Sequence, residues 1–162
     1  MTTTRVVCAV DGSPPSRAAV GFALDEAELR GIPLQLVVAH ATLSARWSGD
    51  ARLATQLTGE QAHEMESLAH HLLDSVIQDR GRPSGVPATV ELLNGPPAEV
   101  IEEHLQPTDL LVIGSRGLGG VRRLLLGSVS GALVQTAPCP VVVVRPQRDP
   151  EASDPSASTG RY

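Results

Sequence analysis

Glycines are concentrated in one short segment of the chain, Gly114-Ser115-Arg116-Gly117-Leu118-Gly119-Gly120. Four glycines in these seven residues would let the backbone turn tightly and bring its amides to phosphate oxygens without side chains in the way. Arg116 would add positive charge to such a site. Glycine clusters that follow strands are also common as plain tight turns, so the segment alone favours a phosphate site only modestly.

Two further groups of residues could complete a phosphate site. Gly127-Ser128 opens an expected helix, whose unpaired first amides and positive dipole end favour an anion, and Ser128 adds a hydroxyl. Asp11-Gly12-Ser13 follows the first expected strand, where Asp11 could hold a divalent cation, Mg²⁺, or a ribose hydroxyl. Each group also has a structural interpretation, because Ser128 suits a helix N-cap and Asp-Gly is a common turn pair.

The sequence lacks the motifs of the common nucleotide-dependent enzymes. Its thirteen basic residues are all arginine, so it has no Gly-Lys-Ser or Gly-Lys-Thr of a Walker P-loop. The glycine cluster follows the fourth expected strand and lacks the third glycine of a dinucleotide fingerprint. Ser115 has no Gly-x-Ser-x-Gly context, and no acid and base pair stands out. These features favour binding over catalysis.

The histidines give no metal site. His63, His70 and His71 lie in an expected helix, but no cysteine or paired carboxylate completes a ligand set, and a solvated helix face is the simpler interpretation. His40, at the end of an expected strand, is expected to be a structural histidine with satisfied hydrogen bonds rather than a base.

Composition narrows the class of protein. The 162 residues, 41% of them hydrophobic, suffice for one well-packed domain. The net charge of -5 argues against a general nucleic-acid binder. Cys8 and Cys139 form neither a disulfide framework nor a metal knuckle, so both are expected to be reduced thiols in a core. With no signal-peptide pattern and no apolar run of about 18 residues, a cytoplasmic protein without a membrane partner is expected.

Short runs rich in β-branched residues alternate with segments of helical spacing, which is typical of an α/β protein with a parallel sheet and crossover helices. The expected strands are Val6–Val10, Leu34–His40, Ala88–Leu93, Asp109–Ile113 and Val141–Val144. Helices are expected from Pro14 to Gly31, from Asp50 to Asp79 with a candidate break at Gly59, after Pro97, and from Ser128 to Thr136. The stretch 42–49 is expected to be a loop, and the tail 147–162 to be disordered.

Helical spacing also predicts which side chains face the core. In the first helix the expected buried stripe is Ala18, Ala19, Phe22, Ala23 and Ala27. In the long second helix it is Leu53, Leu57, Met65, Leu68, Leu72 and Val76.

The spacing of the glycines resembles a known signature. Gly114, two residues, Gly117, nine residues and then Gly127-Ser128 resembles the ATP-binding pattern of the universal stress protein family. The resemblance extends to Val-Asp-Gly-Ser at 10–13, Ala-His-Ala at 39–41 and Ala-Pro-Cys-Pro-Val-Val-Val-Val at 137–144. It predicts a domain of this family over residues 1–146. The segment from Thr42 to Asp50, with the only tryptophan at position 47, departs from the pattern.

The resemblance implies a single-domain, three-layer α/β sandwich of the adenine nucleotide alpha hydrolase-like type, with a five-stranded parallel sheet in the order 3-2-1-4-5. That order makes the first and fourth strands neighbours, so that the two candidate loops border one crevice. By similarity, Asp11 and Gly12 lie near the ribose and phosphates and Ala41 offers backbone groups to adenine. The segment Gly114, Ser115, Arg116, Gly117, Leu118, Gly119 and Gly120 then wraps the ribose and phosphates, while the phosphate tail is held by Gly127, Ser128 and Val129.

The resemblance also implies a homodimer formed through the last strand, Val141–Val144, which would cover an apolar sheet edge. The first functional hypothesis is therefore an ATP-binding dimeric regulator of stress response or dormancy, with an unknown protein partner and at most slow hydrolysis. One alternative is a true ATPase or nucleotidyl-transferring enzyme that uses Asp11 and Mg²⁺. Another is a dimeric scaffold with an empty pocket.

Overall fold

The computed structural model describes residues 2–40, 51–115 and 126–145, with the backbone alone for 51–58. In chain order the elements are β1 (Arg5–Ala9), α1 (Pro14–Arg30), β2 (Leu34–His40), α2 (Ala51–Asp79), β3 (Ala88–Asn94), α3 (Pro97–His104), β4 (Asp109–Gly114), α4 (Ser128–Thr136) and β5 (Val141–Val144). The strands form one parallel sheet in the order β3-β2-β1-β4-β5. The expected α/β fold and strand order are confirmed.

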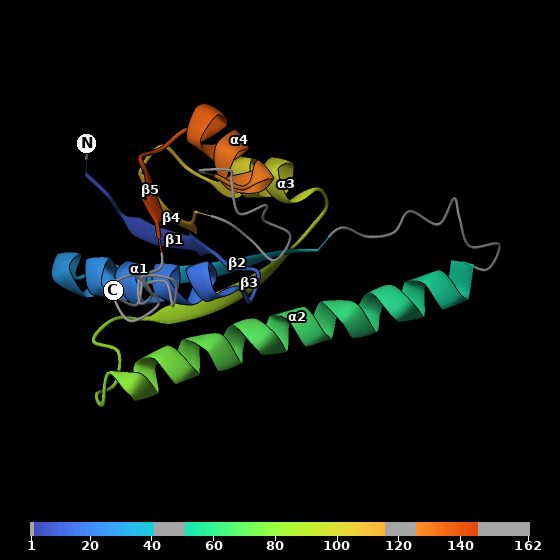
Figure 1. Cartoon of the computed structure of the whole chain (residues 1–162), viewed down its shortest axis with the longest axis horizontal. Coiled ribbons are helices and arrows are strands. Elements are labelled where there is room, and N and C mark those ends of the chain that lie inside the picture. The colour runs from blue at the N-terminus through green and yellow to red at the C-terminus, as the bar shows by residue number, and fades with distance from the viewer. Residues whose placement is uncertain (1, 41–50, 116–125, 146–162) are drawn as a thin grey trace, which may run out of the picture.

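Helices cover both faces of the sheet and make a three-layer molecule. In Figure 1, α1 and α2 lie on one face, and α3 and α4 lie on the other. Strands β1, β2 and β4 are buried on both sides, which explains their nearly continuous apolar sequences. The residues of β5, by contrast, are only partly buried, because it is the last strand of the sheet.

Each face of the sheet has its own hydrophobic core. On the α1 and α2 side, Val6, Cys8, Leu36 and Val38 of the central strands pack against residues of both helices. On the α3 and α4 side, the core is built from Val7, Val37, Ile101, Leu105, Leu111, Ile113, Leu133 and Cys139. The alternation of side chains along each strand therefore divides the sheet residues between the two cores.

The element boundaries agree with the sequence predictions to within one or two residues, but two details of the helices were wrong. Gly59 does not divide α2, which runs unbroken over 29 residues. The buried stripes were predicted only in part. Ala19, Ala23, Ala27 and Val76 are buried as expected, but Phe22 is 36% exposed and Leu68 is 51% exposed, and Val20 and Ala69 are buried instead.

The start of α1 is set by side-chain hydrogen bonds and by backbone geometry. Ser13 is the N-cap, and its hydroxyl accepts a hydrogen bond from the Ser16 N–H. Proline follows directly at the first helical positions, where no backbone N–H is needed. At the other end Gly31 takes the left-handed conformation (φ 64°) that closes the helix. The loop between β1 and α1 is thus held firmly in place.

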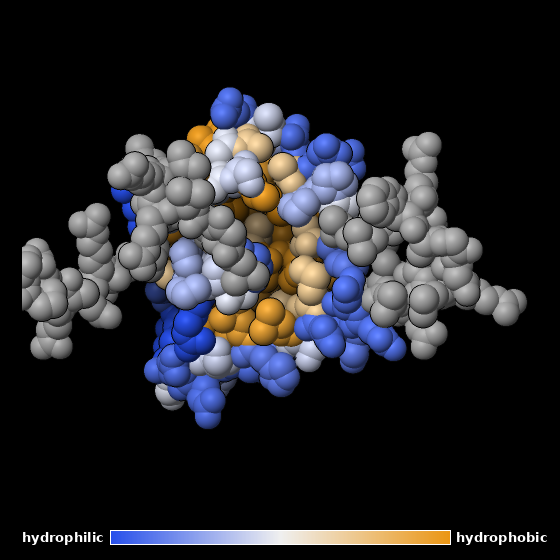
Figure 2. All heavy atoms as spheres, turned by 45° about the vertical axis from the view of Figure 1, so that its right-hand side comes forward, coloured by the Kyte–Doolittle hydropathy of each residue, from blue (hydrophilic) through white to orange (hydrophobic). Residues whose placement is uncertain are grey.

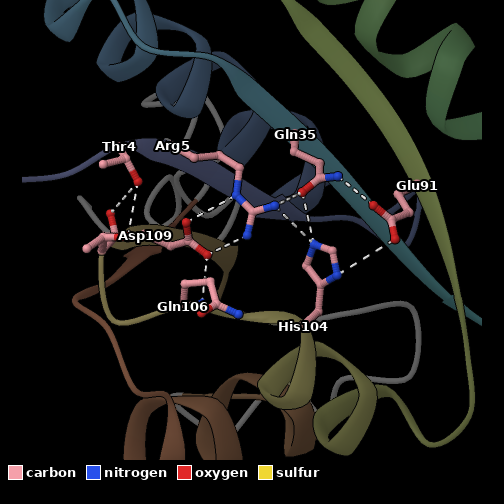
Figure 3. Close-up of polar contacts among 8 residues, drawn as sticks. Thr4, Arg5, Gln35, Glu91, His104, Gln106 and Asp109 are labelled. Carbon is pink, nitrogen blue, oxygen red and sulfur yellow. Dashed lines mark hydrogen bonds and ion pairs between the residues drawn. The ribbon is translucent and has the colours of Figure 1, made fainter.

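A polar network ties the amino ends of the strands together (Figure 3). Arg5, at the start of β1, donates from Nε to Asp109 Oδ1 (3.1 Å) and from Nη2 to Asp109 Oδ2 (2.6 Å), and Asp109 opens the neighbouring β4. The network continues through Gln35 and His104 to Glu91, where Gln35 Nε2 donates to Glu91 Oε2 (2.6 Å). Because these groups satisfy one another, the network stabilises this edge of the sheet.

Candidate functional site

The sheet order places the two loops singled out from the sequence at the same edge. Strands β1 and β4 are hydrogen-bonded neighbours, with Ala9 opposite Ile113. The chain leaves β1 into residues 10–13 and leaves β4 at Gly114 and Ser115, so both loops start at adjacent positions of the carboxyl edge, on the right-hand side of the sheet in Figure 1. Ligands of open parallel sheets bind at such a point, where the direction of the strand order reverses.

Asp11 anchors the first of these loops. Its Oδ1 accepts hydrogen bonds from the Ser13 hydroxyl (2.6 Å) and from the Ser13 N–H (3.1 Å). Its own N–H donates to the Ser16 hydroxyl (3.2 Å). The carboxylate is therefore held in a fixed orientation at the carboxyl edge of the sheet, while Asp11 itself remains only partly buried.

Gly12 occupies a position that other residues cannot adopt without strain. Its φ of 78° lies in the left-handed region, and a Cβ at this position would be 2.7 Å from Leu68 Cδ2. Leu68 belongs to α2, so this helix lies directly against the first loop. The half-exposed Leu68 is thus a residue of the site edge, and the helical periodicity gave no way to separate it from the core stripe.

A pair of hydrogen bonds joins the end of β4 to the start of α4. The Gly127 N–H donates to the Ser115 carbonyl (2.9 Å), and the same carbonyl accepts from the Ser130 hydroxyl (3.1 Å). Ser115 is 1% exposed and its N–H donates to the Val144 carbonyl (2.8 Å), which fixes it to β5. Ser115 and Gly127, twelve positions apart in sequence, are therefore held side by side.

The start of α4 has no side-chain cap among the described residues. Gly127 is the N-cap, in an extended conformation (φ -72°, ψ 170°). Ser128 is the first helical residue and is exposed, so it is not the N-cap that the alternative interpretation required. An uncapped helix start with an exposed hydroxyl can bind an anion. Val129 follows in the same turn and is partly buried.

Gly114 has a packing role that the sequence interpretation did not anticipate. A Cβ at this position would be 3.0 Å from both the carbonyl carbon and the Cβ of Pro15 in α1. The glycine thus allows β4 to approach the first turn of α1 closely, and this contact brings the two loops together.

The remaining predicted site residues lie outside the described part of the chain. They are Ala41, Arg116, Gly117, Leu118, Gly119 and Gly120. The expected loop at 42–49 and the tail 147–162 also lie outside it. Their assignments stay predictions.

His40 differs from its expected role. It is the last residue of β2, only 6% exposed, and its Nε2 has no hydrogen-bond partner in the part of the chain that the structure describes. The expectation of a satisfied structural histidine was therefore wrong. Figure 2, which turns the right-hand side of Figure 1 forward, shows hydrophobic atoms in the floor of a hollow at this side of the molecule. The feature of the sequence that could have marked His40 as a site residue is its position at the end of an expected strand, beside the candidate site.

The described residues do not form a metal site of their own. Over residues 2–40, 51–115 and 126–145, no group of three His, Cys, Asp or Glu side chains is placed to hold a metal ion.

A surface groove between α1 and α2 is lined in part by charged side chains. Arg17 pairs with Asp79 and Arg80 pairs with Asp25, so opposite charges neutralise each other in this groove. Within the same described ranges, the structure contains no helix long and apolar enough to span a bilayer.

Both cysteines are free and buried, as expected. Burial raises the pKa of the Cys8 thiol, and burial is also the main cause that raises the pKa of the Cys139 thiol. Because the thiolate is the reactive form, neither residue is suited to nucleophilic chemistry.

A protein-family model described as the universal stress protein family matches residues 2–145. A universal stress protein of Mycolicibacterium smegmatis is 36% identical over 155 residues, which cover 88% of this chain and 46% of that protein. The chain thus spans about half the length of this relative. A putative universal stress protein of Staphylococcus haemolyticus is 29% identical, with 100% of this chain and 96% of that protein covered.

Solved structures of the same family share the fold. A universal stress protein from Lactobacillus plantarum superposes with a TM-score of 0.76 at 23% identity, covering 90% of this chain and 99% of that one. A universal stress protein in complex with cAMP gives a TM-score of 0.63 at 22% identity, covering 91% and 100%. One from Archaeoglobus fulgidus in complex with dAMP gives 0.55 at 22% identity, covering 89% and 99%.

Proposed function

Because the chain belongs to the universal stress protein family, we propose that it is an ATP-binding regulatory protein whose nucleotide lies between the carboxyl ends of β1 and β4. The observation that carries the proposal is the hydrogen bond from the Gly127 N–H to the Ser115 carbonyl. It holds the uncapped start of α4 at the end of β4, beside the loop of Asp11. An anion-binding helix start and an oriented carboxylate then border one crevice.

Each part of the proposed site has a distinct role. Gly127, Ser128 and Val129 hold the phosphate tail through helix-start amides and the Ser128 hydroxyl. Asp11 and Gly12 lie near the ribose and the phosphates. The segment from Gly114 to Gly120, with Arg116, wraps the ribose and phosphates, and Ala41 offers its backbone to the adenine.

An adenine nucleotide is the ligand best supported by the comparisons. The two complexes reported above hold cAMP and dAMP, and both are proteins of the same fold. Neither of these ligands has a triphosphate. The proposal of ATP therefore depends on the uncapped α4 start and on the glycine spacing Gly114, Gly117 and Gly127-Ser128.

The described residues fit a Mg²⁺ ion that arrives with the nucleotide. Such ions are usually held by one or two carboxylates together with substrate phosphates. Of the described loop residues 10–15, 114–115 and 126–129, Asp11 alone carries a carboxylate. Asp11 would thus share the ion with the phosphates, and the ion would neutralise part of their charge.

The proposed role is regulation rather than turnover. Nucleotide occupancy changes a dimer interface or a surface for a protein partner in stress response or dormancy, in the cytoplasm. The dimer forms through β5, whose four valines are only partly buried at the end of the sheet. Hydrolysis is at most slow, because no acid and base pair is placed among the described residues of the site.

Two measurements on the purified chain test this role. Mass spectrometry of the ligand released on denaturation should find an adenine nucleotide, and steady-state phosphate release from ATP should stay below one turnover per chain in a minute. Several turnovers per minute would favour the ATPase alternative. No released nucleotide, together with no calorimetric binding of ATP, would favour the scaffold alternative and contradict the proposal.

A further inference from the structure

The side chain of His40 needs a hydrogen-bond partner that the described residues do not supply. His40 ends β2, and its own carbonyl is already used, since it accepts from the Gly95 N–H (2.8 Å). The imidazole is 6% exposed, and Nε2 is buried without a partner. Buried polar atoms are nearly always hydrogen-bonded, so an unpaired one at a sheet edge points to a bound ligand or an ordered water.

The position of His40 within β2 shows on which side of the sheet this partner must lie. Leu36 and Val38 belong to the core beneath α1 and α2, whereas Val37 belongs to the opposite core. Alternation along the strand places the His40 side chain on the α1 and α2 side. It lies two residues beyond Val38, at the carboxyl edge of the sheet.

Leu68 approaches the same edge from α2. This helix packs against β2 and β3 and continues beyond the sheet on the side of the proposed site (Figure 1). Leu68 lies against Gly12 and yet is 51% exposed, so about half of this apolar side chain is uncovered beside the first loop. Gly12 and His40 each lie three residues beyond the paired residues Ala9 and Val37 of the adjacent strands β1 and β2.

We propose that His40 and Leu68 form the base-binding part of the nucleotide site, with His40 Nε2 hydrogen-bonded to a heteroatom on the edge of the base and Leu68 packed against its face. The surroundings favour a neutral partner. Val38, Ala69 and Leu92 make this side of the sheet apolar, so a phosphate here would lose its hydration without compensation. The inference rests on the proposed function and adds which residues read the base.

Calorimetric titrations with ATP and with inorganic tripolyphosphate separate base contacts from phosphate contacts. His40→Ala should weaken ATP binding about tenfold, because one buried hydrogen bond is lost. Leu68→Ala should weaken ATP binding several-fold through the lost apolar contact, whereas Leu29→Ala, at a side chain 81% exposed, should not change it. Neither site variant should change the affinity for tripolyphosphate. An unchanged ATP affinity in His40→Ala, or an equal loss for tripolyphosphate, would overturn the inference.

Two additional measurements test the inference even if His40→Ala fails to fold. His40→Gln keeps a side-chain amide near the position of Nε2 and should recover part of the ATP affinity lost in His40→Ala. In the unsubstituted protein, the ¹⁵N resonance of His40 Nε2 should shift on addition of ATP and not on addition of tripolyphosphate. An identical resonance with and without bound ATP would show that water alone serves His40 and would overturn the inference. If the unsubstituted protein binds no nucleotide, the proposed function fails as well.

Discussion

The backbone N–H of Gly127 donates to the carbonyl of Ser115 across 2.9 Å, which joins the first turn of α4 to the end of β4. The Ser130 hydroxyl donates to the same carbonyl (3.1 Å). Ser115 in turn donates to β5, so the helix start is fixed relative to both β4 and β5. A preorganised helix start can bind phosphates without first paying the entropy of ordering.

Gly127→Ala should weaken ATP binding at least tenfold while leaving the fold intact. The extended conformation of Gly127 (φ -72°) is open to any residue, so the added Cβ causes no backbone strain, and we expect it to act by entering the phosphate path. Gly117→Ala is expected to act in the same way. Calorimetry with ATP measures the effect.

Gly131→Ala, one turn along in the same helix, is the matched control. Its new Cβ would meet only Leu126 Cβ, at 4.0 Å, so it should raise stability by about 0.5–1 kcal/mol and leave ATP affinity unchanged. Wild-type affinity in both Gly127→Ala and Gly117→Ala would refute the phosphate site.

Gly12→Ala should destabilise the fold by about 1–3 kcal/mol in chemical denaturation, since φ 78° is strained for alanine and the Cβ would overlap Leu68. The steric part should vanish in the double variant with Leu68→Ala, because that change removes the Cδ2 atom. A double-mutant cycle thus measures the contact between the first loop and α2. Strictly additive effects would show that Leu68 does not confine Gly12 in solution.

The hydrogen bonds of Glu28 should make the stability difference between the wild type and Glu28→Gln depend on pH. The Arg82 side chain donates to its Oε2 (2.6 Å) and the Gly85 N–H donates to its Oε1 (3.1 Å), and the Arg82 hydrogen bond is the main cause that lowers the pKa of Glu28. A carboxylate with a lowered pKa stabilises the fold above its ordinary pKa and loses that contribution as the pH falls through the lowered value.

Urea unfolding of the wild type and Glu28→Gln should therefore differ most near neutral pH and converge in acid. The same comparison in an Arg82→Ala background should show a smaller difference, because the main hydrogen bond is gone. A difference that stays constant down to acid pH would contradict this assignment.

Val143→Pro should abolish the proposed dimer and keep the monomer folded. The carbonyls of Pro140 and Val144 accept from β4, so backbone groups of alternate residues, Val141 and Val143, face away from β4. Proline at 143 therefore removes an outward N–H, whereas Val142→Pro should damage the sheet itself. Sedimentation should give the monomer mass for Val143→Pro. A wild-type monomer, or a dimer that survives the substitution, would contradict pairing through β5.

The strands were predicted well because each contains a short, mostly apolar run between turn residues, and β1, β2 and β4 are buried in the sheet. Helix faces were predicted less well. The apolar spacing of α2 suggested Leu68 as a core residue, but the buried stripe is centred on Ala69, Leu73 and Val76, and only the packed structure shows that Leu68 meets the loop of Gly12.

For the candidate site, too, local features could be predicted from the sequence and contacts between distant residues could not. Local spacing singled out Asp11, Gly127 and Ser128 as candidates, because turns and helix starts are local features, and their role in binding stays a prediction. The packing of Gly114 against Pro15 and the unpaired Nε2 of His40 depend on residues distant in sequence, and no local pattern contains them. The pairing of Arg5 with Asp109 was missed for the same reason, although both open neighbouring strands.

The decisive experiment is a calorimetric titration of ATP into the unsubstituted chain after bound nucleotide has been removed. We expect saturable binding with one site per chain, and a loss of affinity of at least tenfold in Gly127→Ala that Gly131→Ala does not share. A flat titration for the correctly folded, unsubstituted chain would contradict the proposed ATP binding.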